Sequence, residues 1–169
     1  GTCAERISYG PGRLIMPLPD DVPWPVVRDR LRHVFGLTSF LLCQQSERSL
    51  DVLARDIIAT LGEQPVSTFA VRTKRADKTY PVGSPEISRV IGRAVQDHTR
   101  ARVDLEHPEL EIHIEMLDRD AFFSLEKVSA TVRALVSTAR RSMVATRRNV
   151  AASWVVIVST SRKGRSTNL

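Results

Sequence analysis

The segment TFAVRTKRADKTYPVGSPEISRVIGRAVQDHT, residues 68–99, decides the fold because its hydrophobic period changes within a few residues. Over residues 67–74 the alternation of side chains puts Phe69 and Val71 on one face of a strand and Arg72 and Lys74 on the other. From Ser84 onward the apolar residues recur at helical spacing. The segment therefore predicts a strand, a loop over residues 75–81 and an amphipathic helix.

The predicted helix has one apolar face and one basic face. Ser84 suits the N-cap, Pro85 the first helical position and Glu86 the first turn. The apolar face is expected to contain Ile87, Val90, Ile91, Ala94 and Val95, and the opposite face Arg89, Arg93, Gln96 and Arg100. We expect the first face to pack in the core and the second to carry a stripe of positive charge.

The flanking sequence predicts further helices and strands in alternation. Strands are expected over residues 13–18 and 37–43, and on both sides of His107-Pro108 within residues 101–117. Helices are expected over residues 23–35 and 49–61, ended by Gly36 and Gly62. The apolar face of the first helix is predicted to contain Trp24, Val27, Leu31, Val34 and Phe35. This arrangement indicates the α+β fold class.

Composition narrows the functional classes. With 169 residues and 42% hydrophobic content, the chain can form one compact domain or two small ones. Cys3 and Cys43 are far apart and form no CxxC pair, which argues against a metal site or a disulfide framework. There is no apolar run long enough for a membrane span or a signal peptide. We expect a soluble, cytoplasmic protein without a membrane partner, and the spacing of nucleophiles and bases predicts no catalytic residue.

The positive charge is distributed unevenly. The net charge is +6, yet residues 124–169 contain nine Lys or Arg residues and a single acidic residue, Glu126. The preceding residues are slightly acidic. The sequence pI of about 10.0 therefore does not show that the front of the chain binds nucleic acid.

Basic residues nevertheless cluster around the loop. The candidate binding residues are Arg72, Lys74, Arg75, Lys78, Tyr80, Arg89 and Arg93. The end of the strand, the loop and the helix are expected to present one basic surface, where arginines fork onto phosphate oxygens and Tyr80 stacks on an unpaired base. The alternative interpretation is that these are solvated charges on a helix face and a turn.

Four segments carry a resemblance to a known family: FAVRTKRADKTYP, SPEISRVIG, ARVDLEHPELEIHIE and AFFSLEKV. Together they resemble the THUMP domain of the bacterial tRNA 4-thiouridine synthetases, the tRNA sulfurtransferases that also serve thiamine biosynthesis. Residues 5–45 resemble the second part of the small ferredoxin-like domain that precedes THUMP in that family. The expected organisation is a partial ferredoxin-like domain over residues 1–46, a THUMP α/β unit over 47–126 and an atypical basic tail over 127–169.

The resemblance implies tRNA binding, chiefly at the 3′ CCA end, so that a separate catalytic domain can thiolate a uridine. It assigns RNA contacts to Arg72, Lys74, Arg75, Lys78, Arg89 and Arg93. The family's SGGxDS loop and a cysteine to carry a persulfide are absent from this sequence. We therefore expect no cofactor in this chain, ATP belonging to the missing catalytic domain, and a catalytic domain or a sulfur-carrier protein as a partner. Two alternatives stay open: a complete sulfurtransferase, and a THUMP module acting in trans with a methyltransferase or an acetyltransferase.

The two ends of the chain depart from the family pattern. Family members begin with a further strand and helix, so the N-terminal domain is expected to be incomplete. In the tail, residues 125–143 show helical periodicity and WVVIVST, residues 154–160, predicts a strand. One interpretation is a basic arm that adds affinity for RNA or a membrane surface. The hypothesis that we prefer at this point is a foreign or out-of-frame end to a truncated gene.

Overall fold

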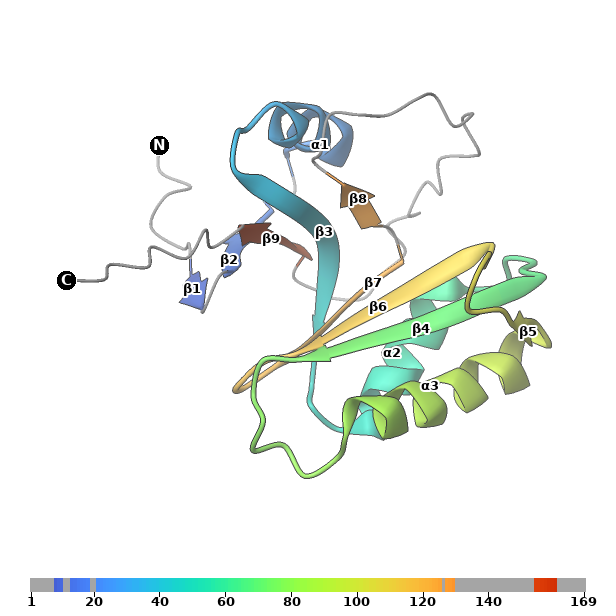
Figure 1. Cartoon of the computed structure of the whole chain (residues 1–169). Coiled ribbons are helices and arrows are strands. Elements are labelled where there is room, and N and C mark those ends of the chain that lie inside the picture. Colours follow the sequence, from blue (N-terminus) through green and yellow to red (C-terminus); the bar gives the residue numbers. More distant parts are fainter. Residues whose placement is uncertain (1–7, 11–12, 19–20, 126, 130–153, 161–169) are drawn as a thin grey trace.

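The computed structural model describes residues 8–10, 13–18, 21–125, 127–129 and 154–160. The described strands form one nine-stranded mixed sheet in the order β1-β2-β9-β3-β7-β6-β4-β5, with β8 pairing β3 outside this path. The strands are β1 (Ser8–Gly10), β2 (Arg13–Pro17), β3 (Leu37–Ser46), β4 (Thr68–Arg75), β5 (Arg102–Val103), β6 (Leu110–Met116), β7 (Ala121–Ser124), β8 (Lys127–Ser129) and β9 (Trp154–Thr160). The described helices are α1 (Trp24–Arg32), α2 (Leu50–Leu61) and α3 (Ser84–Thr99) (Figure 1). The predicted α+β class is confirmed.

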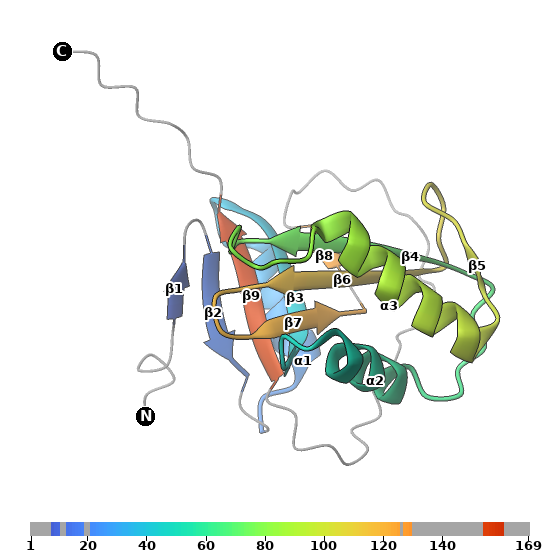
Figure 2. The same ribbon diagram turned by 90° about the horizontal axis from the view of Figure 1, so that it is seen from below.

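In one half of the sheet, α2 and α3 cover the same face of β7, β6, β4 and β5 (Figure 2). β4 runs parallel to β5 and β6, as expected for strands joined through a crossover helix. The main hydrophobic core lies between the helices and this face, and its fully buried members include Phe69, Ile91 and Ile112.

The predicted faces of α3 are largely confirmed. Ile87, Ile91 and Val95 are completely buried, whereas Val90 lies at the rim of the core and is 36% exposed. The predicted N-cap is wrong by one residue: Gly83 occupies that position, Ser84 begins the helix, and no side chain among the described residues forms a capping hydrogen bond.

The other half of the sheet contains β1, β2, β9 and the first part of β3, all antiparallel to their neighbours. α1 packs on one face of this half, where Trp24, Val27 and Leu31 meet Phe40 of β3. β3 is long enough to belong to both halves. One of its edges pairs with β9 and the other with β8 and β7.

The predicted end of α1 is wrong by about one turn. The helix ends at Arg32, and the N–H groups of His33 and Val34 turn back to Arg30 O and Leu31 O, at 3.1 and 3.2 Å. Gly36, at φ +89°, then reverses the chain into β3. Phe35 lies in this turn and is fully exposed instead of on the apolar face, and Val34 is 48% exposed.

The tail is partly described. The predicted strand over residues 154–160 is confirmed as β9. The predicted helix over residues 125–143 is wrong where it can be checked, because residues 127–129 form β8 and pair with Ser39–Leu41 of β3. Residues 130–153 lie outside the described residues. In the part of the chain that the structure describes, no helix is long and apolar enough to cross a membrane.

Candidate nucleic-acid interface

The two faces of β4 have different surroundings. A Cβ added at Gly92 of α3 would lie 3.9 Å from Val71 Cγ2, and Ser88 Oγ donates to Thr73 Oγ1 at 2.8 Å. Val71 and Thr73 therefore face α3. Arg72 and Lys74 alternate with them and lie on the opposite, open face of the sheet, as the sequence predicts.

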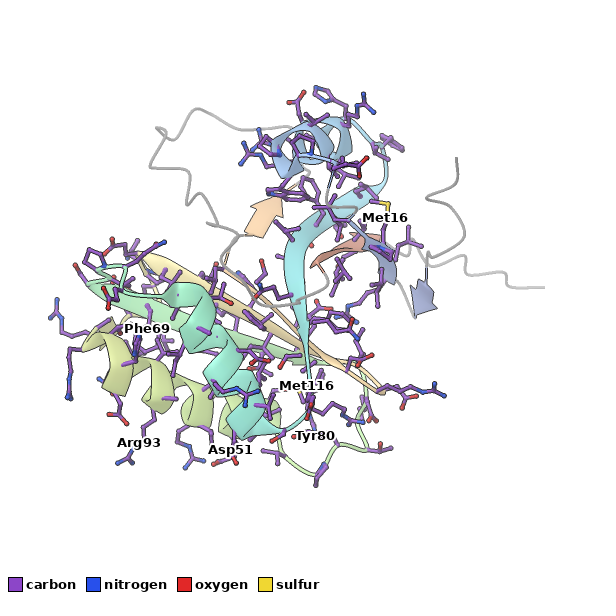
Figure 3. All side chains as sticks on the ribbon, turned by 180° about the vertical axis from the view of Figure 1, so that it is seen from behind. Met16, Asp51, Phe69, Tyr80, Arg93 and Met116 are labelled. Carbon is purple, nitrogen blue, oxygen red and sulfur yellow. The ribbon has the colours of Figure 1, made fainter. Side chains whose placement is uncertain are left out.

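The expected single basic surface divides in two. Arg89 and Arg93 are exposed on the outer side of α3, and Arg93 points away from the sheet (Figure 3). Arg72 and Lys74 are exposed on the other side of the sheet. Since the sheet and the helix layer lie between the two pairs, the structure does not bring them onto one face.

On the open face, Arg72 is engaged by its neighbours. Arg72 Nε lies 2.9 Å from Glu111 Oε1, and Arg72 Nη2 donates to Leu105 O at 2.6 Å. Glu111 Oε2 also lies 3.1 Å from His113 Nε2. Burial alone would raise the pKa of Glu111, but the hydrogen bonds from Arg72 and His113 outweigh it and lower that pKa. Arg72 is thus largely neutralised within the protein.

A second ion pair lies on the same face. Arg13 Nε of β2 is 2.7 Å from Glu115 Oε2 of β6, and the Glu115 side chain is only 4% exposed. The two atoms make no well-aligned hydrogen bond with each other, so the contact is an ion pair. It joins the two halves of the sheet. Lys74 is exposed beside it, and no hydrogen bond or ion pair of its ammonium group occurs among the described residues.

Arg75 and Tyr80 shape the loop from within. Arg75 is half-buried, and its Nη1 donates to Tyr80 O at 2.8 Å and to Val82 O at 2.9 Å. Tyr80 Oη donates to Arg48 O at 2.7 Å, and the Arg48 guanidinium lies 4.7 Å from the centre of the Tyr80 ring. Arg48 therefore covers one face of the ring on which a base was expected to stack.

Arg48 is a loop-supporting residue that the sequence did not reveal. Its Nη2 donates to Asp77 Oδ2 at 2.9 Å, and its Nη1 donates to Asp118 O. Asp77 Oδ1 also accepts the hydroxyl and the amide N–H of Thr79, at 2.6 and 2.8 Å. The hydroxyl hydrogen bond is the largest of the causes that lower the pKa of Asp77. The Asp-x-Thr spacing could have predicted this Asx-turn, but nothing local marks Arg48, which is 29 residues away.

The outer side of α3 and the adjoining loop carry the freest cations. We call Lys78, Arg89, Arg93 and Arg100 the helix–loop surface. Lys78, Arg93 and Arg100 are exposed and have no carboxylate partner among the described residues. Arg89 is 75% exposed, and its one ion pair within the described part of the chain is with Glu86, one turn earlier on the same helix. From Arg89 to Arg100 the stripe extends about 16 Å along the helix. Such a line of exposed cations can follow a phosphate backbone.

The family comparison agrees with this architecture. Residues 44–126 match the THUMP domain family. These residues include the end of β3, the strands β4, β5, β6 and β7, and the helices α2 and α3. They make up the half of the structure that carries both basic surfaces. This part of the chain is a THUMP domain.

The similar proteins identify the kind of enzyme in which this domain occurs. The chain is 34% identical over 123 residues to a probable tRNA sulfurtransferase of Moorella thermoacetica, covering 72% of this chain and 31% of that protein. It is 31% identical over 117 residues to a probable tRNA sulfurtransferase of Thermus thermophilus, covering 69% of this chain and 29% of the relative. The chain is thus homologous to the THUMP-containing region of tRNA sulfurtransferases and spans about a third of their length.

Solved structures show the same fold. PH1313 from Pyrococcus horikoshii superposes with a TM-score of 0.64 at 26% identity, covering 74% of this chain and 43% of PH1313. A 4-thiouridine synthetase in complex with RNA and bound ATP superposes with a TM-score of 0.60 at 20% identity, covering 73% of this chain and 32% of the synthetase. At 20% identity the second likeness speaks for the fold alone.

Proposed function

We propose that this chain is a tRNA-binding module, in which the THUMP domain holds the 3′ CCA end of tRNA while a catalytic domain outside this sequence thiolates a uridine. The observation that carries the proposal is the homology of the THUMP region to tRNA sulfurtransferases. A protein that acts on tRNA needs a domain that grips this substrate. The absence of the SGGxDS loop from the sequence leaves the adenylation chemistry to another domain.

The electrostatics of the THUMP domain favour the helix–loop surface as the main contact. Its cations are exposed, and the one carboxylate that pairs with them among the residues that the structure describes, Glu86, lies in the first turn of α3. On the open face, by contrast, Arg72 and Arg13 are paired with Glu111 and Glu115. Cations without internal partners gain most from phosphate, because they lose no existing ion pair and each contact releases counterions.

The seven sequence-predicted residues then take different roles. We assign direct phosphate contacts to Lys78, Arg89 and Arg93. Lys74 lies on the open face of the sheet, apart from the helix–loop surface, and is available for a separate contact there. Arg75 and Tyr80 are positioning residues, since their polar atoms bond to the backbone of the loop and of Arg48. Arg72 donates hydrogen bonds to the Glu111 carboxylate and to the backbone carbonyl of Leu105. It binds RNA only if it gives up one of these two partners.

Binding of the full chain to tRNA with and without the 3′ CCA, measured across a salt series, tests the proposal. The double variant Arg89→Gln with Arg93→Gln should make the negative slope of log affinity against log salt shallower by about 1.4, because each single-strand phosphate contact contributes about 0.7. The matched control is Arg30→Gln with Arg32→Gln, which removes the same charge from exposed positions of α1. Equal slopes for both double variants would contradict the assigned surface, and equal affinity for the two tRNAs would contradict recognition of the 3′ end.

A further inference from the structure

β9 holds an unusual place in the sheet. It lies antiparallel between β2 and β3, with its residues 155–159 opposite β2 and 154–160 opposite β3. Among the described strands, β2 pairs otherwise only with β1. Without β9, the described β1–β2 hairpin would therefore have no backbone hydrogen bond to the rest of the sheet.

Both faces of β9 are covered. Val156 and Val158 pack on the α1 side, in the cluster that contains Phe40 and Leu18. Val155 and Ile157 pack on the other side against Leu41, Cys43 and Phe122. These four β9 side chains are at most 5% exposed. Continuous burial of consecutive residues is typical of a central strand and not of an edge strand.

β9 lies far along the sequence from the strand β2 with which it pairs. The strand follows the THUMP family match, which ends at residue 126, and residues 130–153 separate it from β8. It nevertheless pairs with β2, near the beginning of the chain. Through Ile157 and Val155 it also contacts the cluster of Phe122, a residue of THUMP strand β7. β9 thus joins the first part of the chain to the THUMP domain.

We infer that the gap between β2 and β3 is a strand-acceptor site, and that its ligand is the chain's own segment 154–160. The ligand is recognised by antiparallel backbone pairing on both edges and by apolar side chains on both faces, the chemistry of β-strand addition. The segment is a built-in partner that completes the first half of the sheet. The hypothesis of a foreign end predicts the opposite, namely a segment that the rest of the chain does not need.

A cleavable form of the full chain tests this inference. A recognition sequence for a specific protease is inserted between residues 144 and 145, the purified protein is cut, and the products are passed through gel filtration with light scattering. We expect the C-terminal fragment to stay bound at the mass of one chain, and a labelled synthetic peptide of residues 152–162 to exchange into the gap. Ile157→Asp should release the fragment, whereas the control Ile157→Val should retain it, because it keeps an apolar side chain of nearly the same volume.

Amide exchange of β2 keeps the inference falsifiable if Ile157→Asp fails to fold. In the cut wild-type protein, the fragment is removed with mild denaturant and the remainder is returned to native buffer. Hydrogen exchange of the β2 amides should then be more than about tenfold faster, and adding the synthetic peptide should restore their protection. A fragment that separates in native buffer while the β2 and β3 amides remain as protected as before would overturn the inference. A bound fragment in a complex with the mass of two chains would also overturn the inference, since β9 would then come from a second copy of the chain and not from the same chain.

Discussion

The role assigned to Arg75 makes a prediction that separates positioning from contact. Arg75→Ala removes two hydrogen bonds from a charged donor to Tyr80 O and Val82 O. A hydrogen bond to a charged group contributes about 1.5–3 kcal/mol. Because both bonds come from the same nitrogen, Nη1, and Arg75 is only half-buried, we count the pair as little more than one such bond. We expect a loss of about 2 kcal/mol, and we expect it in the opening of the loop more than in global unfolding.

The Thr79 amide reports on this opening, because its N–H donates to Asp77 Oδ1 at 2.8 Å within the loop. A change of about 2 kcal/mol corresponds to about 30-fold faster hydrogen exchange of this amide in Arg75→Ala. Affinity for tRNA should fall less, because it scales with the fraction of molecules whose loop is closed. The salt slope should stay unchanged, since Arg75 is assigned no phosphate.

Lys78→Ala is the matched control, because Lys78 is exposed in the same loop without a partner among the described residues. It should lower the salt slope by about 0.7 and leave Thr79 exchange as it is. Two results would refute the reasoning. One is unchanged Thr79 exchange in Arg75→Ala, and the other is a salt slope that falls in Arg75→Ala as much as in Lys78→Ala, which would make Arg75 a direct contact.

Three further predictions concern stability and reactivity. The pKa of Glu111 is lowered from 4.5 in the folded protein. The contribution of Glu111 to stability is therefore complete above pH 4.5 and is lost as the pH falls through the folded-state pKa. Glu111→Gln should flatten this loss of stability, measured by urea unfolding between about pH 5 and 3. An unchanged pH profile would contradict the Arg72 ion pair in solution. Ile91→Ala, at a fully buried position, should lower the free energy of unfolding by about 2–5 kcal/mol, and the control Val90→Ala by clearly less, so equal losses would contradict the assigned faces of α3. Burial, followed by the charge of Glu115, raises the pKa of the Cys43 thiol, so alkylation of Cys43 at pH 8, read separately from Cys3 by peptide mapping, should be much slower in native protein than in urea. Rapid labelling of Cys43 in the native protein would show that β9 and β3 open.

Much of the THUMP domain could be predicted because the local spacing of apolar residues indicates its helices and strands. The alternation of β4 and the apolar stripe of α3 follow from spacing alone, and both are confirmed. Local patterns mislead where the chain turns. Val34 and Phe35 continue the spacing of α1, yet the helix ends before them because Gly36 reverses the chain into β3. Arg48 could not be found at all, since its partners Asp77 and Tyr80 are distant in sequence.

The sequence by itself determined which residues are cations, which segments are helices and strands in the THUMP domain, and the family to which that domain belongs. Only the tertiary structure decided which cations are free. It placed Arg72 beside Glu111 and Arg13 beside Glu115, and it turned Arg75 inward while leaving Lys78 and Arg93 exposed. It also placed residues 154–160, a predicted strand without a predicted partner, in the middle of the sheet. The reason is that periodicity reports on neighbours along the chain, whereas ion pairing and strand order depend on groups that only folding brings together.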